Sequence, residues 1–201
     1  QFFEAWTALA TAPAALERMH KIWSGEESPA QFTLSERDLI RLTQIPAIRI
    51  PSQADKIVSA QLVRINNPDN RRRLTFSAPA LAADAAVRDA FFASLADAQN
   101  RGTERWVVDA LASLHHPSRT DHSVKYLPDT LELLQEIQRT GDIFFPTRWL
   151  SNSFQNHNSA EAVATVDRFL ESRPDYSAQL RMKILQAADS PVRAYRIIQA
   201  H

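Results

Sequence analysis

The segment that decides the fold is LPDTLELLQEIQRTG, residues 127–141. Its side chains recur three or four positions apart, as on one face of a helix: Leu127, Leu131, Leu134 and Gln138, with Leu133 and Ile137 beside them. A glycine after Thr140 is typical of a helix end, where a left-handed residue closes the last turn. The segment therefore predicts an amphipathic helix that ends at Gly141.

The same helical spacing recurs along most of the chain. The repeating sets are Val58, Leu62 and Ile65; Val87, Phe91 and Leu95; Val107, Ala110, Leu111 and Leu114; and Leu180, Ile184 and Ala187. No run alternates between apolar and polar residues as a half-buried strand does, and no Asn-Gly or Asp-Gly hairpin turn occurs. These patterns predict an all-α fold.

Proline, glycine and asparagine interrupt the helical sets at short intervals. The predicted breaks are Ser24-Gly25, Pro46, Pro51, Asn67-Pro68, Pro79, Asn100-Arg101-Gly102, His116-Pro117, Thr140-Gly141, Pro146, Pro174 and Pro191, the last three near helix starts. Ser35, followed by Glu36 and Asp38, has the features of an N-cap with an acidic first turn. We expect about ten helices of roughly 10–16 residues. Short turns favour antiparallel neighbours, so the predicted architecture is an irregular, HEAT-like α-solenoid or superhelix of helical hairpins.

The composition indicates a globular domain without a charge bias. The chain has 201 residues, 44% of them hydrophobic, and its 23 Lys and Arg balance its 23 Asp and Glu. This balance argues against a nucleic-acid surface. No apolar run reaches the roughly 20 residues of a membrane span, and there is no cysteine for disulfides or thiolate zinc sites. We predict one helical domain over residues 1–201, with no nucleic-acid partner and no membrane span.

The N-terminus, Gln-Phe-Phe-Glu-Ala-Trp, starts within a helical pattern and lacks the features of an intact signal peptide. We therefore expect the chain to be a piece cut from something longer. A mature protein left after processing is the alternative.

Motifs of the common enzyme classes are missing. No His is followed by Glu, so the zinc-binding His-Glu-x-x-His pattern does not occur, and neither does a Gly-x-Ser-x-Gly turn or a glycine-rich phosphate loop. The sequence therefore predicts no catalytic residue, no metal ligand and no cofactor site here. On its own the chain is not expected to be an enzyme.

Three short segments are candidates for function. In His115-His116-Pro117, neighbouring helical side chains point about 100° apart and converge poorly on a metal, so a helix C-terminus is favoured. Arg71-Arg72-Arg73 is either a solvated helix start or a carboxylate-binding group, since a guanidinium matches a carboxylate with two parallel hydrogen bonds. The dense aromatic residues of 141–150 are expected to form core at a helix–helix corner rather than an exposed docking patch.

Longer segments carry a family resemblance. They are Asn67-Pro68-Asp69, Pro79-Ala80-Leu81, Arg88-Asp89-Ala90-Phe91-Phe92, Leu114-His115-His116-Pro117, EIQRTGDIFFP at residues 136–146, Arg148-Trp149-Leu150 and KILQAAD at residues 183–189. In this order, from about Asp38 to Asp189, the sequence resembles the C-terminal domain of bacterial zinc aminopeptidases of the aminopeptidase N type.

The resemblance implies a helical superhelix that caps a peptide-binding chamber and limits substrate size. The zinc, its ligands and the general base of that family lie upstream, so none is carried over to this chain. In related enzymes arginines follow an Asn-Pro-Asn or Asn-Pro-Asp turn, and Arg73 matches one such position, with Arg72 beside it. The sequence departs from the family at Asn70, where relatives tend to have a basic residue. Arg72 and Arg73 are thus the candidate substrate-binding residues, and the expected partners are a catalytic domain of the same polypeptide and a peptide.

Two other functions remain open. A free-standing helical adaptor would bind a protein segment in a concave groove. RNA binding through the arginine triplet would weaken strongly with added salt. Because close bacterial relatives in the family are often exported, the resemblance points to the periplasm or cell envelope, with the cytoplasm as the alternative.

Overall fold

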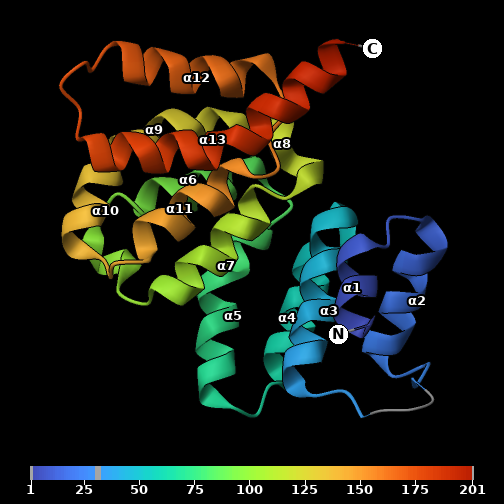
Figure 1. The fold of residues 1–201 in the computed structure, drawn as a ribbon. Helices are drawn as coiled ribbons and strands as arrows, with labels where there is room; N and C mark the ends of the chain where they lie inside the picture. The colour runs from blue at the N-terminus through green and yellow to red at the C-terminus, as the bar shows by residue number, and fades with distance from the viewer. Residues whose placement is uncertain (1, 30–32, 201) are drawn as a thin grey trace. The chain divides into compact units, whose positions relative to one another are not determined.

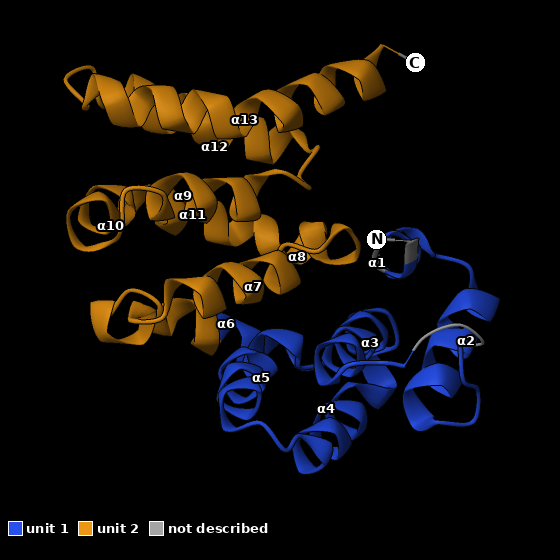
Figure 2. Cartoon of the chain, turned by 60° about the horizontal axis from the view of Figure 1, so that its bottom comes forward, with its two compact units in different colours: residues 1–89 blue, residues 90–201 orange. Residues whose placement is uncertain are grey.

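The computed structural model describes residues 2–29 and 33–200, and all regular elements among them are helical (Figure 1). Since no strand occurs in these residues, the predicted all-α fold is confirmed. None of their helices has both the length and the apolar character needed to cross a bilayer. The chain divides into two compact units, residues 1–89 and 90–201, which we describe separately (Figure 2). The single domain and its HEAT-like arrangement stay predictions.

The first unit is organised around one helix, α3. Its helices are α1 (Phe2–Leu9), α2 (Pro13–Ser24), α3 (Glu36–Arg49), η1 (Pro51–Gln53), α4 (Ala54–Arg64) and α5 (Pro68–Leu81), and α6 (Ala85–Ser94) runs from this unit into the next. α3 packs against α1, α2, α4 and α5. Leu42 of α3 is buried with Trp23 and Ile57, whereas Ile48 is buried with Leu74 in a second cluster. α3 thus contributes to both apolar clusters of this unit.

Ser35 caps α3 as predicted. Its Oγ accepts a hydrogen bond from the backbone N–H of Asp38 (3.3 Å), and Asp38 Oδ2 accepts one from the backbone N–H of Ser35 (2.9 Å). This reciprocal pair is a capping box, and Glu36 adds a second negative charge at the positive end of the helix. The local sequence therefore fixes where the central helix begins.

In the second unit α11 has the central position. The helices are η2 (Ala98–Arg101), α7 (Glu104–Leu114), η3 (Pro117–Arg119), α8 (Thr120–Ser123), η4 (Val124–Tyr126), α9 (Leu127–Glu132), α10 (Leu134–Thr140), α11 (Phe145–Phe154), α12 (Ala160–Glu171) and α13 (Ala178–Gln199). α11 packs against α7, α9, α10 and α13, and α12 packs against α9 and α13 (Figure 1). Trp149 of α11 is fully buried and donates from Nε1 to the carbonyl of Thr130 (3.0 Å).

The predicted helix over residues 127–141 is two helices. α9 ends at Glu132 and α10 begins at Leu134, with Leu133 between them. The apolar face is nevertheless confirmed, because Leu131 and Leu134 are both fully buried. The spacing therefore identified the buried face, although it gave no sign of the break.

Gly141 ends α10 as predicted but is not left-handed. Its φ of −93° and ψ of 172° are extended values that any residue adopts. A Cβ at this position would lie 2.6 Å from Cδ1 of Phe145 and 3.0 Å from Oε1 of Glu104. Glycine is therefore needed for close packing rather than for its backbone conformation. The left-handed glycine among the described residues is Gly25, at the end of α2.

Three of the predicted proline breaks are wrong. Pro46 lies inside α3, Pro79 inside α5 and Pro191 inside α13, which is 22 residues long. Pro146, in contrast, lies in the first turn of α11 as predicted. A proline inside a helix removes one backbone hydrogen bond and costs about 3 kcal/mol. Pro46 and Pro191 are buried, so the packing of their rings offsets part of this cost.

Candidate functional site

The arginine segment lies at the start of α5, behind a well-formed N-cap. Asn67 Oδ1 accepts hydrogen bonds from the backbone N–H groups of Asp69 (2.8 Å) and Asn70 (3.3 Å). Pro68 occupies the first helical turn, where its missing N–H costs little. The Asn-Pro-Asp sequence therefore fixes the beginning of the helix that carries the arginines.

One carboxylate of α3 stabilises the connection between α4 and α5. Glu36 Oε1 accepts from the backbone N–H groups of Asn66 (2.7 Å) and Asn67 (3.3 Å), and its Oε2 accepts from Nδ2 of Asn70. The hydrogen bond from Asn70 is the main cause that lowers the pKa of Glu36 below its usual value. Asn70, which stands where the resembled family tends to have a basic residue, thus has a structural role in this chain.

The three arginines of α5 point in different directions. Arg71 Nη2 donates to the carbonyl of Ile65, the C-cap of α4, which gives this residue a structural role. Arg72, whose side chain is 68% exposed, forms an ion pair with Asp69, three residues earlier. Arg73 is half-buried. Because successive helical residues point about 100° apart, Arg72 and Arg73 share a helix but do not face a common point.

His115 ends α7, as predicted for a helix C-terminus, but its ring is buried. Its backbone N–H donates to the carbonyl of Leu111 (2.9 Å), and its Nδ1 lies 2.9 Å from Nε2 of His157, which follows α11. His116 does not face this pair and instead accepts from the backbone N–H of Ser118 (3.2 Å). Among the described residues, no group of three or more His, Cys, Asp or Glu could hold a metal ion.

The hydrogen bonds of the two buried histidines determine which nitrogens carry protons. His157 also forms a hydrogen bond with the backbone of Ser153. This bond acts against burial by raising the pKa of the ring, which is the effect of a ring N–H that donates to a carbonyl. We therefore assign this proton to Nδ1 of His157, so that its Nε2 accepts from Nδ1–H of His115. The remaining nitrogen of His115, Nε2, is buried without a partner. Burial lowers the pKa of His115 well below its usual value and that of His157 to about 4.

The aromatic segment 141–150 is only partly core. Phe145 and Trp149 are buried as predicted. Ile143 and Phe144 are 74% and 59% exposed, so the prediction is wrong for these two. The change from exposed to buried residues coincides with a turn at Asp142. Its carboxylate accepts from the backbone N–H groups of Phe144 (2.7 Å) and Phe145 (2.8 Å). The helix begins behind this turn, with Phe144 as its N-cap, and the two residues before it stay outside the core.

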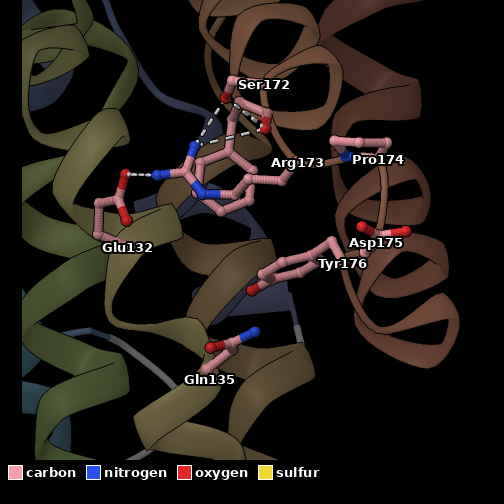
Figure 3. A pocket seen from close by; sticks show the side chains of 8 residues that line it. Glu132, Gln135, Ser172, Arg173, Pro174, Asp175 and Tyr176 are labelled. Carbon is pink, nitrogen blue, oxygen red and sulfur yellow. Dashed lines mark hydrogen bonds and ion pairs between the residues drawn. The ribbon is translucent and has the colours of Figure 1, made fainter.

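The structure also contains a pocket that the sequence did not predict. Its volume is about 370 Å³, and it lies between α9, α10, the end of α12 and the turn before α13 (Figure 3). The lining residues are Glu132, Gln135, Phe169, Ser172, Arg173, Pro174, Asp175 and Tyr176. Part of this lining is shared with an adjoining hollow of about 190 Å³ that also contacts Arg168. All of these residues belong to the second unit.

A proline turn builds one wall of this pocket. A residue before proline disfavours the helical conformation, so Pro174 explains why α12 stops before Arg173. The backbone N–H of Tyr176 donates to the carbonyl of Arg173 (3.1 Å), which closes a β-turn with Pro174 at its second position. This Arg-Pro-Asp turn is the one feature of the pocket that a sequence pattern indicates.

The guanidinium of Arg173 is engaged on several sides. Nη1 donates to Oγ of Ser172 (2.9 Å), and Nη2 forms an ion pair with Glu132 Oε1 (Figure 3). Its Cζ lies 4.2 Å from the centroid of the Phe169 ring, which in turn meets the Tyr176 ring edge-on at 5.2 Å. The Tyr176 hydroxyl is buried without a hydrogen-bond partner, and burial raises the pKa of this side chain. The pocket thus combines a neutralised cation, aromatic rings and unpaired polar groups.

No protein-family model matches this chain, and no curated protein or solved structure is significantly similar to it. The resemblance to aminopeptidases therefore rests on the sequence segments alone.

Proposed function

We propose that this chain is the non-catalytic C-terminal helical domain of a zinc aminopeptidase of the aminopeptidase N type. In that role it caps the peptide-binding chamber and helps to select substrates. The ordered resemblance from about Asp38 to Asp189 and the all-α fold support the proposal. The observation that carries it is the corner at Asn67, where the N-cap and the hydrogen bonds to Glu36 fix the start of the helix that carries the arginines. Zinc and the general base are expected in a catalytic domain of the same polypeptide.

Within this proposal Arg72 contributes a point charge toward the substrate. Its ion pair with Asp69 joins two highly exposed side chains, and such a pair is worth about 0–1 kcal/mol. A peptide carboxylate or carbonyl can therefore replace Asp69 at little cost. Arg73 acts from a second direction, because its side chain leaves the helix about 100° away.

The sequence upstream of this chain provides the first test. The proposal requires a His-Glu-x-x-His motif with a further zinc ligand in the coding region that precedes residue 1. Reconstitution follows: this domain, added to the separately expressed upstream portion with zinc, is expected to raise the hydrolysis of an aminoacyl reporter or to change the preferred peptide length. A parent gene without a metallopeptidase motif would refute the assignment.

The role of the arginines has a separate test in the full-length enzyme. Replacing Arg72 or Arg73 by alanine is expected to weaken peptide binding by about tenfold, the equivalent of one charge-assisted hydrogen bond of roughly 1.5 kcal/mol. Arg193→Ala is the matched control, because Arg193 is 70% exposed and pairs with Asp189 one turn away on α13. If both variants keep the wild-type affinity and length preference, the arginine role fails while the domain assignment stands.

A helical adaptor is the second candidate, and one observation favours it. Ile143 and Phe144, in the connection before α11, are 74% and 59% exposed, and exposed apolar surface marks a partner contact where it forms part of a contiguous patch. The adaptor would be a stable monomer with a discrete peptide partner and no catalytic region upstream. Phe144→Ser would then weaken partner binding without loss of stability, whereas unchanged binding would count against this alternative.

A further inference from the structure

The pocket on the second unit has a negative charge balance. Arg173 is neutralised by Oε1 of Glu132, and Phe169 covers one face of its guanidinium. Asp175 lines the same pocket, and its carboxylate forms no ion pair or hydrogen bond with any residue in the described ranges. An anion would have to displace Glu132 from Arg173, whereas a cation meets the half-engaged carboxylate of Glu132. The unpaired charge of Asp175 lies at the edge of the pocket, beyond Tyr176 (Figure 3).

Several lining groups are able to accept hydrogen bonds from a ligand. Glu132 uses only Oε1 in its ion pair, and the amide of Gln135 has no partner within residues 2–29 and 33–200. The Tyr176 hydroxyl lacks a partner although it is buried, which costs about 1–3 kcal/mol. In Figure 3 Glu132 and Arg173 lie on one side of the pocket, and the hydroxyl end of Tyr176 points toward the space above Gln135. The acceptors therefore surround one space.

The geometry points to a site for an arginine side chain of a bound peptide. A guanidinium is planar, has five N–H donors in a fixed fork and stacks on aromatic faces, so it matches the Glu132 carboxylate, the Gln135 amide and the ring of Tyr176. The volume of about 370 Å³ lies at the small end of ligand pockets, which suits one long side chain. Phe169 and Pro174 provide apolar surface for its alkyl portion. This site is independent of the function proposed above.

Two model ligands of nearly the same shape test whether the pocket recognises the charge of a guanidinium. N-acetyl-L-arginine amide carries the guanidinium, and the citrulline analogue has nearly the same shape with a neutral urea. Titration of the ¹⁵N-labelled full chain, followed by amide chemical shifts, is expected to give a Kd of about 1 mM or tighter for the arginine compound. The shifts are expected to concentrate in residues 132–135 and 172–177. The citrulline compound is expected to bind at least tenfold more weakly.

A pair of matched variants locates the site. Asp175→Asn removes the unpaired carboxylate and is expected to weaken the arginine compound about two- to fivefold, the range for one partly exposed charge. Asp167→Asn changes an exposed aspartate of α12 outside the pocket and is expected to leave the affinity unchanged. Glu132→Gln, which also frees the charge of Arg173, is expected to abolish measurable binding.

Three results would overturn the inference. Equal affinity for the citrulline compound would show that charge is not recognised. Shifts that are spread over Asp and Glu residues outside the pocket, and that Asp175→Asn leaves unchanged, would show unspecific charge screening. Binding that survives Glu132→Gln, in a variant whose helical circular dichroism is unchanged, would place the guanidinium elsewhere.

Discussion

Lowering the pH from 7.5 to 5.0 is expected to destabilise the second unit through His115 and His157. Both rings are buried, and their lowered pKa values mean that the native state keeps them neutral at pH 5. In the unfolded chain an imidazole has a pKa near 6.5 and takes up a proton below that pH. Since the unfolded state then binds more protons than the native state, the free energy of unfolding falls as the pH falls.

The size of the fall in the free energy of unfolding can be calculated for His157. Its pKa falls from 6.5 to about 4, and one pKa unit corresponds to about 1.4 kcal/mol. The loss of stability begins near pH 6.5, reaches about 2 kcal/mol at pH 5 and levels off at roughly 3 kcal/mol below pH 4. His115 adds a loss of the same sign, because its pKa is also lowered. Above about pH 7 neither residue makes the stability depend on pH.

The window between pH 7.5 and 5.0 separates the histidines from the carboxylates with lowered pKa. Glu104 acts in the opposite sense, because burial raises its pKa and its protonation stabilises the native state as the pH falls. The pKa of Glu36 is lowered by its hydrogen bond from Asn70, and that of Asp142 by the backbone N–H of Phe144. A carboxylate with a lowered pKa stabilises the native state above its unfolded value, and this contribution is lost only as the pH falls below about 5. A decrease measured at higher pH is therefore not due to these groups.

Urea unfolding followed by circular dichroism at the two pH values measures the effect. The wild type is expected to lose about 2 kcal/mol or more, and the double variant His115→Asn/His157→Asn is expected to lose much less. His116→Asn is the control, because His116 lies outside the buried pair and asparagine can also cap the turn at Ser118. The reasoning is refuted if NMR shows the His157 ring titrating near 6.5 in the native wild type, a result that does not depend on whether the variants fold.

Three further substitutions test the packing and capping described above. Tyr176→Phe removes an unpaired buried hydroxyl, so the free energy of unfolding is expected to stay the same or to rise by about 1 kcal/mol in urea titrations; a clear loss would reveal a bond that the structure lacks. Gly141→Ala places a methyl group against Phe145 and Glu104 and is expected to cost about 1–3 kcal/mol, seen as a lower Tm; an unchanged Tm would contradict the close approach. Asn67→Ala removes the cap of α5 and is expected to cost about 1 kcal/mol, whereas Asn67→Asp retains most of it.

Features of the fold that depend only on residues a few positions apart in the sequence were predictable. The capping box at Ser35 needs only a serine and an acidic residue three positions apart, and the structure has it. Three of the predicted proline breaks failed, because the effect of a proline depends on what packs around it. Pro46 and Pro191 are buried inside their helices, whereas Pro146 begins one. Propensity sets the cost of an internal proline, and tertiary packing decides whether the helix continues.

The buried polar groups were not predictable, because their partners are far apart in the chain. His115 and His157 are 42 positions apart, and no periodicity connects them. Their pairing arises only when the end of α7 meets the segment that follows α11. Residues 143–144 and Phe145 show the same limit over a shorter distance. All three are apolar, yet only Phe145, which follows the turn at Asp142, is buried.

The arginine segment and the pocket show why a charge run is a weaker indication of a site than convergent side chains. Arg71, Arg72 and Arg73 are adjacent in sequence, but a helix separates their side chains by about 100° at each step. Arg71 therefore serves the fold, and Arg72 is held in an exposed ion pair with Asp69. Glu132 and Tyr176 are distant in sequence, yet α9 and the turn before α13 bring them to one pocket. Convergent groups are able to discriminate between ligands, because a wrong ligand leaves buried polar groups unpaired. A single exposed arginine favours any nearby anionic group, whereas the convergent acceptors of the pocket carry the selectivity that we infer for a guanidinium.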